Sequence, residues 1–173
     1  MQITSPSPAR SRLRRAVVAT LVVAGTGIAG LSGQATAQPA TTKVTGHVAT
    51  QISGGPDCDA PSGQCFAGEI KGVVSGTVEA AINSITPTVQ PDIALVDASV
   101  TIHTRDGDLR FEHEQIVYNI NPTGRGEFSW ILRITSGTGR YAGATGFLQG
   151  AGTAPPATGV STSPYVGEIK LAH

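Results

Sequence analysis

Apolar and polar residues alternate with a period of two along most of the chain from Val44 to Leu171. This period places successive side chains on opposite faces of an extended strand, so each segment has one apolar and one polar face. Helical repeats are almost absent. The predicted inward faces are, strand by strand, Val44, Gly46, Val48, Thr50 and Ile52; every second residue from Phe66 to Ile82; Ala98, Val100 and Ile102; Leu109, Phe111, His113, Gln115 and Val117; Phe128, Trp130, Leu132 and Ile134; and Tyr165, Gly167, Ile169 and Leu171.

These segments predict an all-β fold of about eight antiparallel strands joined by short hairpins. The sequence Arg105-Asp106-Gly107-Asp108 predicts a tight hairpin, because Asp-Gly tolerates the left-handed backbone of such turns. Two proline-containing stretches, Thr86 to Pro91 and Ala154 to Pro164, are expected to be loops. A two-sheet sandwich is the competing architecture. Glycines recurring on the apolar faces favour a closed barrel with a small cavity, because they relieve crowding where strands coil tightly.

The stretch from Ile134 to Gly152, ITSGTGRYAGATGFLQGAG, is the richest in glycine. It predicts a corner where one strand ends, a wide turn packs Tyr141 inward, and the next strand begins near Gly146. At least one of Gly139 and Gly143 is expected to need a positive φ. A phosphate-binding loop is the alternative, but no Lys-Ser/Thr pair follows and no βαβ pattern surrounds the stretch.

The N-terminus has the pattern of a secretory signal peptide, residues 1–37. A basic region ends at Arg15, an apolar run follows from Ala16 to Leu31, and Ala35-Thr36-Ala37 supplies a small-x-small cleavage site. We expect cleavage after Ala37 and secretion to the extracellular space or cell envelope, by the general or the twin-arginine route. The run is short and interrupted by glycines, which argues against a stable membrane anchor.

Cleavage there would change the charge of the chain, because all four charged residues of the segment are arginines. Eight Lys and Arg would remain against twelve Asp and Glu, a net charge of about −4. Without a basic stripe, nucleic-acid binding is not expected. Residues 38–173 are sufficient for one folded domain.

Cys58 and Cys65 are the only cysteines and enclose the turn-rich sequence DAPSGQ. In an exported protein such a pair predicts a disulfide. A metal site is the alternative, but it would have only two thiolates and no histidine nearby in sequence. No metal and no cofactor are expected.

The run from Gly137 to Gly146, GTGRYAGATG, resembles the G-T-G-[RK]-[FY]-x-x-A-x-G signature of the allene oxide cyclase and dirigent superfamily. The segment Tyr165-x-Gly167-x-Ile169 and the hairpin at Gly107 are similar to secreted bacterial members, and the resemblance covers roughly Cys65 to Leu171. It divides the mature chain into an N-terminal strand and disulfide loop, 38–64, and an allene oxide cyclase-like barrel, 65–173.

The resemblance implies an eight-stranded antiparallel barrel with an apolar cavity and no metal or organic cofactor. Plant members cyclise an unsaturated fatty-acid epoxide or steer the coupling of phenoxy radicals, and related bacterial barrels cyclise polyketide chains. The family's catalytic carboxylate matches no residue here, so the resemblance carries over the fold and a cavity but not the activity.

The alternation places His113 and Gln115 on an otherwise apolar inward face, where polar side chains are costly unless they are satisfied or functional. We therefore predict His113 as a catalytic acid/base and Gln115 as ligand-binding, with Thr50, Trp130 and Tyr165 as further ligand-binding residues. The alternative is a structural polar network, or a His113 near an open barrel end in contact with water.

The same alternation puts a set of carboxylates on the outside, namely Glu69, Glu79, Glu112, Glu114 and Glu168. Glu112-His113-Glu114 is not a metal site on a regular strand, because His113 points away from both glutamates. A one-residue register slip would bury both glutamates and is disfavoured. A bulge could still reverse the second half of the strand, as Ile116 and Tyr118 hint.

Two classes of function remain open. The barrel is either a cyclase or isomerase that orients a flexible apolar substrate, or a non-catalytic exported barrel that binds a ligand or an envelope partner. The expected partner is a hydrophobic small molecule. Barrels of this family assemble through their outer faces, so an oligomer is possible, but an exterior rich in Glu and Thr argues against a large apolar interface.

Overall fold

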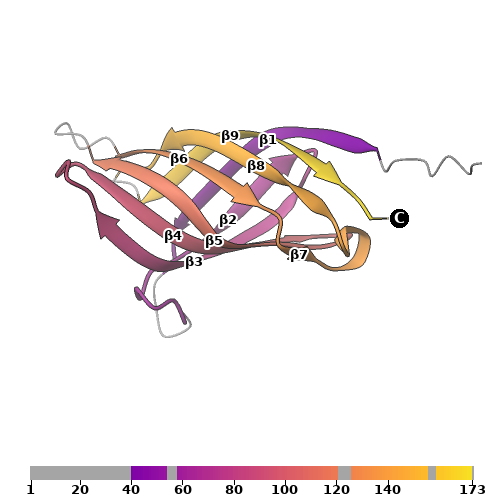
Figure 1. The fold of residues 1–173 in the computed structure, drawn as a ribbon, viewed down its shortest axis with the longest axis horizontal. Helices are drawn as coiled ribbons and strands as arrows, with labels where there is room; N and C mark the ends of the chain where they lie inside the picture. The colour runs from indigo at the N-terminus through magenta and orange to yellow at the C-terminus, as the bar shows by residue number, and fades with distance from the viewer. Residues whose placement is uncertain (1–39, 54–57, 121–125, 156–158, 173) are drawn as a thin grey trace, which may run out of the picture. The chain divides into compact units, whose positions relative to one another are not determined.

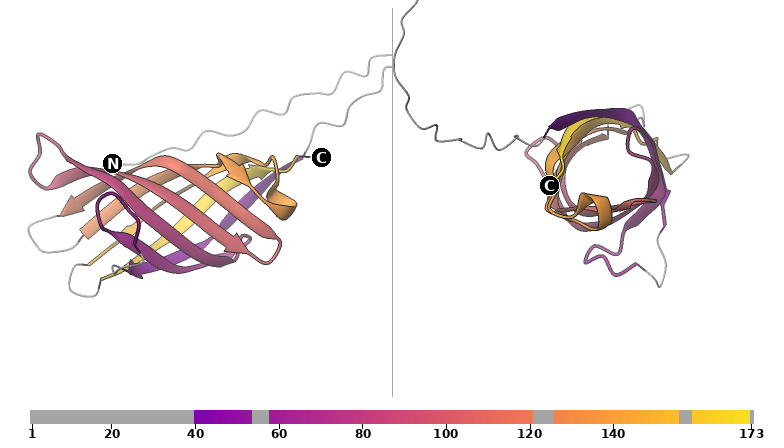
Figure 2. Two further views of the ribbon diagram at one scale, coloured as in Figure 1. Left: turned by 90° about the horizontal axis from the view of Figure 1, so that it is seen from below. Right: turned by 90° about the vertical axis from the view of Figure 1, so that its right-hand side faces the viewer.

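The computed structural model describes residues 40–172 of the chain, apart from 54–57, 121–125 and 156–158. The predicted signal segment and its cleavage site lie outside the described residues. Eight antiparallel strands close into a barrel in the order β1-β2-β3-β4-β5-β6-β8-β9, and β9 pairs with β1 (Figures 1 and 2). The predicted all-β barrel is confirmed.

The elements have the following bounds: β1 (Thr41–Ile52), β2 (Cys65–Gly72), β3 (Gly76–Pro87), β4 (Ile93–Thr104), β5 (Gly107–Ile120), β6 (Gly126–Arg133), β7 (Ser136–Gly137), the 3₁₀ turn η1 (Gly139–Tyr141), β8 (Thr145–Thr153) and β9 (Val160–Lys170). The short β7 pairs with Leu109 and Arg110 of β5. Both predicted loops are shorter than expected, because β3 continues to Pro87 and β9 begins at Val160.

The strand directions give the barrel two different ends. We call one end of the barrel the open end; there the chain leaves β1, β3, β5 and β8 and enters β2, β4, β6 and β9. We call the opposite end the closed end; it holds the hairpin between β4 and β5 and the corner from Ile134 to Ala144. The predicted hairpin at Asp106-Gly107 is confirmed, with Gly107 at a φ of 134°.

Tyr165 of β9 fills the barrel toward its closed end and is only 2% exposed. Its hydroxyl accepts a hydrogen bond from the Val74 N–H at 3.1 Å and donates one to the Val74 carbonyl at 3.0 Å. A Cβ at Gly46 would collide with the ring, so glycine makes the space that the tyrosine occupies. Burial raises the pKa of the Tyr165 hydroxyl, which keeps it protonated as a donor.

The glycine-rich corner has the predicted form. Gly139 and Gly143 both adopt positive φ, 55° and 69°, and Tyr141 is buried. The Ile134 N–H donates to the carbonyl of Gly146, which closes the turn between β6 and β8.

A β-bulge at His113 divides β5 into two halves. Ala98 of β4 pairs with Glu114 and Val100 pairs with Phe111, so one residue of β4 faces two residues of β5. His113 takes the φ of 56° that this extra residue requires, the sole positive φ outside glycine in the described part of the chain. Side chains after the bulge therefore have the opposite orientation to the one that simple alternation predicts.

A second bulge lies directly across β4. Ile82 of β3 pairs with Ala98 and Ser84 pairs with Asp97, which leaves Asn83 as the extra residue. The Asn83 amide donates to Asp97 Oδ1 at 2.6 Å, and His113 Nδ1 lies 3.5 Å from Asp97 Oδ2. Asp97 thus contacts both bulges from the strand between them.

The Cys58–Cys65 disulfide is present, as predicted, and belongs to the connection between β1 and β2 at the open end.

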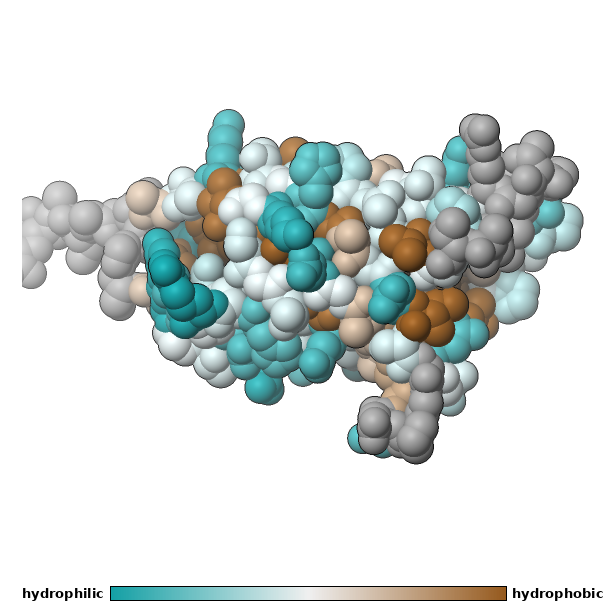
Figure 3. Space-filling view, turned by 180° about the vertical axis from the view of Figure 1, so that it is seen from behind, coloured by the Kyte–Doolittle hydropathy of each residue, from teal (hydrophilic) through white to brown (hydrophobic). Residues whose placement is uncertain are grey.

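On the face of the barrel seen in Figure 3, apolar side chains form separate small areas between polar ones. A shallow outer groove, lined by Val117, Asn119, Glu127, Ser129 and Thr153 among others, crosses β5, β6 and β8. None of the described helical residues forms a segment long and apolar enough to span a membrane.

Candidate functional site

A cavity of about 470 Å³ lies inside the barrel. Seven of the eight strands of the ring contribute Val, Ile, Leu, Ala or aromatic side chains to its wall, and β9 contributes Ser161. Residues of the open-end loops such as Gln64 and Pro155 border the cavity. This volume falls within the roughly 300–1,000 Å³ typical of small-molecule sites. The cavity is therefore large enough for a small organic ligand.

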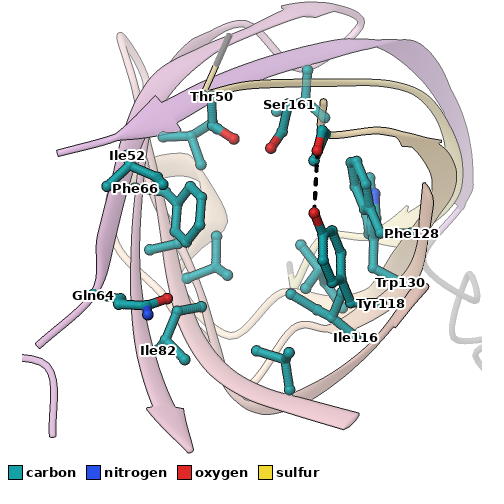
Figure 4. Close-up of a pocket in the computed structure, with 18 of the residues that line it drawn as sticks. Thr50, Ile52, Gln64, Phe66, Ile82, Ile116, Tyr118, Phe128, Trp130 and Ser161 are labelled. Atoms are coloured by element: carbon teal, nitrogen blue, oxygen red, sulfur yellow. Dashed lines mark hydrogen bonds between the residues drawn. The ribbon is translucent and has the colours of Figure 1, made fainter. Parts of the chain in front are cut away.

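Aromatic rings stand on two sides of this cavity. Phe66 of β2 projects from one wall, and Tyr118, Phe128 and Trp130 project from the wall formed by β5 and β6 (Figure 4). Flat apolar surfaces that face each other across a cavity suit a ligand with rings or unsaturated carbons.

The polar atoms of two of these aromatic residues are already engaged by the protein. The Tyr118 hydroxyl donates to the carbonyl of Ala154 at 3.1 Å, the bond drawn in Figure 4. The Trp130 N–H donates to the hydroxyl of Ser163 at 3.3 Å, which in turn donates to the carbonyl of Pro164. Both residues present mainly apolar surface to the cavity.

Three other polar side chains line the cavity near its open end: Thr50, Gln64 and Ser161. Thr50 of β1 and Ser161 of β9 are direct cross-strand partners, and their hydroxyls point into the cavity (Figure 4). No hydrogen bond within the described part of the chain engages either hydroxyl.

No Asp, Glu, His, Lys, Arg or Cys is among the described residues that line the cavity, and Tyr118 is its one ionisable side chain there. Glu114 is the one buried carboxylate among the described residues; it lies beside β6 and does not border the cavity. Burial raises the pKa of Glu114, and the hydrogen bond from the Arg133 N–H opposes this shift without cancelling it.

The placement predicted for His113 and Gln115 is wrong. His113 exposes 79% of its side-chain surface, Gln115 is also exposed, and neither borders the cavity. The bulge turns His113 outward and reverses the residues that follow it. For the same reason Val117 faces outward, and Glu114, predicted on the exterior, is 7% exposed.

The structure places Thr50 and Trp130 in the cavity wall, as the alternation predicted, and their contact with a ligand stays a prediction. Tyr165 points inward as predicted but does not border the cavity, because its position on β9 puts it at the closed end. The five predicted site residues are therefore not brought together, and two of them share one cavity.

Sequence reasoning missed Tyr118 and Ser161 as cavity residues. The signal for Tyr118 was present in the apolar pair Ile116 and Tyr118, which the bulge brings to the inner face. Ser161 gave no such signal, because it lies in a stretch whose prolines predicted a loop. Phe66 and Phe128 were on the predicted inner faces, and Gln64 lies in a connection without alternation.

Among the described residues, no group of three or more His, Cys, Asp or Glu side chains is arranged to hold a metal ion. The Glu112-His113-Glu114 string is separated by the bulge, with the imidazole outside and the Glu114 carboxylate buried.

No protein-family model matches the sequence, and no curated protein matches it. Among solved structures, the pterocarpan synthase dirigent protein PsPTS1 is similar, with a TM-score of 0.35 and 14% sequence identity. The match covers 79% of this chain and 99% of that protein. A similarity at this level carries no activity from one protein to the other.

Proposed function

We propose that the barrel binds a hydrophobic small molecule in its cavity, with entry at the open end. The observation that supports this most strongly is the cavity itself, about 470 Å³ with an almost entirely apolar wall. Moving an apolar molecule from water into such a site is favourable by about 25 cal/mol for each Å² of apolar surface removed from water.

Two features of the fold support binding in particular. Tyr165 fills the closed end and is held there by both polar atoms of Val74, so the cavity has a floor. The resemblance of the glycine-rich corner to the allene oxide cyclase and dirigent superfamily also favours an apolar ligand in the barrel.

Cyclisation or isomerisation of the bound molecule is the second candidate function. Aromatic walls on two sides of the cavity could hold a flexible unsaturated chain in a folded shape, and such orientation can supply much of the catalysis. The test is incubation with an unsaturated fatty-acid epoxide and chromatographic detection of a product of equal mass. Product formed no faster than in buffer would contradict this second function.

We also propose that the protein acts outside the cytoplasm, after cleavage behind Ala37. The disulfide at Cys58 and Cys65 supports this, since disulfides persist mainly in oxidising compartments. The intact mass of protein recovered from the culture medium tests the cleavage site, and a mass that still includes Arg14 and Arg15 would contradict it.

Binding is tested with N-phenyl-1-naphthylamine, a neutral probe whose fluorescence rises in apolar surroundings. Val96 borders the cavity and its neighbour Leu95 points outward, so Val96→Trp fills the cavity while Leu95→Trp is a matched control. We expect Val96→Trp to weaken probe binding by about tenfold or more, and Leu95→Trp to leave it within about twofold. Equal affinity in both variants, or no binding by the unmodified barrel, would contradict the proposal.

A further inference from the structure

The cavity has a polar position, formed by two paired residues, in a largely apolar wall. Thr50 and Ser161 lie opposite each other on β1 and β9, where directly paired residues have Cβ atoms about 4.5–5.5 Å apart. Both side chains point into the cavity near its open end (Figure 4). Two hydroxyls at this separation can bond to the same atom of a ligand.

Unlike the polar groups of Tyr118 and Trp130, these two hydroxyls have no hydrogen-bond partner in the described part of the chain. The side-chain amide of Gln64, which also borders the cavity, belongs to an exposed residue outside the strands. Tyr118 donates to Ala154 and Trp130 donates to Ser163, so those groups have no need of a ligand. A hydroxyl covered by an apolar ligand without a hydrogen bond loses its solvation, which is unfavourable. The bound molecule must therefore satisfy Thr50 and Ser161 or leave them in contact with water.

The chemistry of the wall restricts which group of a ligand can form hydrogen bonds with Thr50 and Ser161. No charged side chain borders the cavity among the described residues. An ionised carboxylate or amine would lose its hydration there without gaining a counter-charge. An uncharged oxygen, as in an alcohol, phenol, ketone or aldehyde, can accept from both hydroxyls without that loss.

The geometry points to a ligand with an apolar, ring-containing or unsaturated body and one neutral oxygen-bearing head group, bound with that head between Thr50 and Ser161. This inference rests on the proposed function and adds the class and the orientation of the ligand. The body lies deeper in the barrel between Phe66 and the wall of Tyr118 and Trp130, and the head faces the open end.

The test uses three probes of one size: 2-naphthol, 2-methylnaphthalene and 2-naphthoate, each measured by displacement of N-phenyl-1-naphthylamine at pH 7. The variant Thr50→Val/Ser161→Ala removes both hydroxyls. The control Thr45→Val/Thr162→Val removes two exposed hydroxyls from the outer faces of the same strands. Melting temperatures establish that each variant is folded.

We expect Thr50→Val/Ser161→Ala to weaken the binding of 2-naphthol by about tenfold, which corresponds to the loss of one or two neutral hydrogen bonds. The affinity for 2-methylnaphthalene should stay within about twofold of that of the unmodified barrel. The outer variant should change neither probe, and 2-naphthoate should bind the unmodified barrel less tightly than 2-naphthol. Equal effects on both neutral probes, no effect on 2-naphthol, or tighter binding of 2-naphthoate would each overturn the inference. Failure of every probe to bind the unmodified barrel would contradict the proposed function itself.

Discussion

The backbone N–H of Arg133 donates a hydrogen bond of 2.7 Å to the Oε1 of Glu114. The regular pairing of β5 with β6 ends at Gln115 and Ile131, next to the bulge, so the N–H of Arg133 has no strand partner there. The Glu114 side chain supplies the missing acceptor. A carboxylate that sequence alternation places outside is thus part of the junction between two strands.

This arrangement predicts how the stability of the barrel depends on pH. Burial raises the pKa of Glu114 above its ordinary value of 4.5, so the folded state favours the protonated form. The contribution of this group is fully present below about pH 4.5 and is lost as the pH rises through the raised pKa. Glu114→Gln keeps an acceptor for Arg133 and removes the titration.

We therefore expect Glu114→Gln to gain stability relative to the unmodified protein between pH 4 and pH 7, as measured by urea unfolding at each pH. The exposed neighbour Glu112→Gln is the control and should show no such trend. A variant that loses stability relative to the unmodified protein as the pH rises would mean that the hydrogen bond to the charged carboxylate outweighs its desolvation.

His113 holds the positive φ of the bulge and is otherwise exposed. Its contact with Asp97 lies at the surface and contributes little to stability. His113→Gly should consequently be neutral or stabilising, whereas His113→Val should lower the free energy of unfolding by about 1–2 kcal/mol. Equal stability of the two variants in urea unfolding would show that the bulge does not require this backbone conformation in solution.

The corner between β6 and β8 gives a related prediction for Gly139 and Gly143. Both have positive φ, and a Cβ at Gly139 would also collide with the carbonyl of Asp106. We expect valine at either position to cost more than about 1–2 kcal/mol, with the larger loss at Gly139. Unchanged melting temperatures for both variants would contradict this.

The disulfide should stabilise the connection at the open end without being required for folding. Replacing both Cys58 and Cys65 with serine is expected to lower stability by about 2–3 kcal/mol, from the loss of loop-closure constraint in the unfolded chain. The native protein should be two daltons lighter than its reduced form. Full reaction with a thiol reagent before reduction would mean that the bond does not form.

The barrel could be predicted from the sequence because the period-two pattern, the Asp106-Gly107 turn and the glycine-rich corner all agree locally. Ile116 and Tyr118 hinted at a bulge in this strand, but its presence and its place at His113 could not be predicted, because the extra residue is apparent only against the partner strand β4. Because of this one extra residue, Ile116 and Tyr118 face the interior in place of Gln115 and Val117.

The sequence also could not predict how deep along the barrel axis an inward side chain lies. Alternation tells which face a side chain occupies, and it was right for Thr50, Trp130 and Tyr165. It does not tell whether an inward residue lies in the cavity or in the packed floor. That depends on where each strand begins, and Tyr165 is placed by the pairing of β9 with β1.

The most direct test of the central claim is to locate a bound ligand. Crystals of the barrel grown with 6-bromo-2-naphthol allow the bromine to be placed by its anomalous scattering. We expect one bromine inside the barrel, between Phe66 and the wall of Tyr118 and Trp130, with the naphthol oxygen toward Thr50 and Ser161. Bromine found only in the outer groove beside Val117, or an empty cavity at saturating ligand, would contradict the claim that this cavity is the binding site.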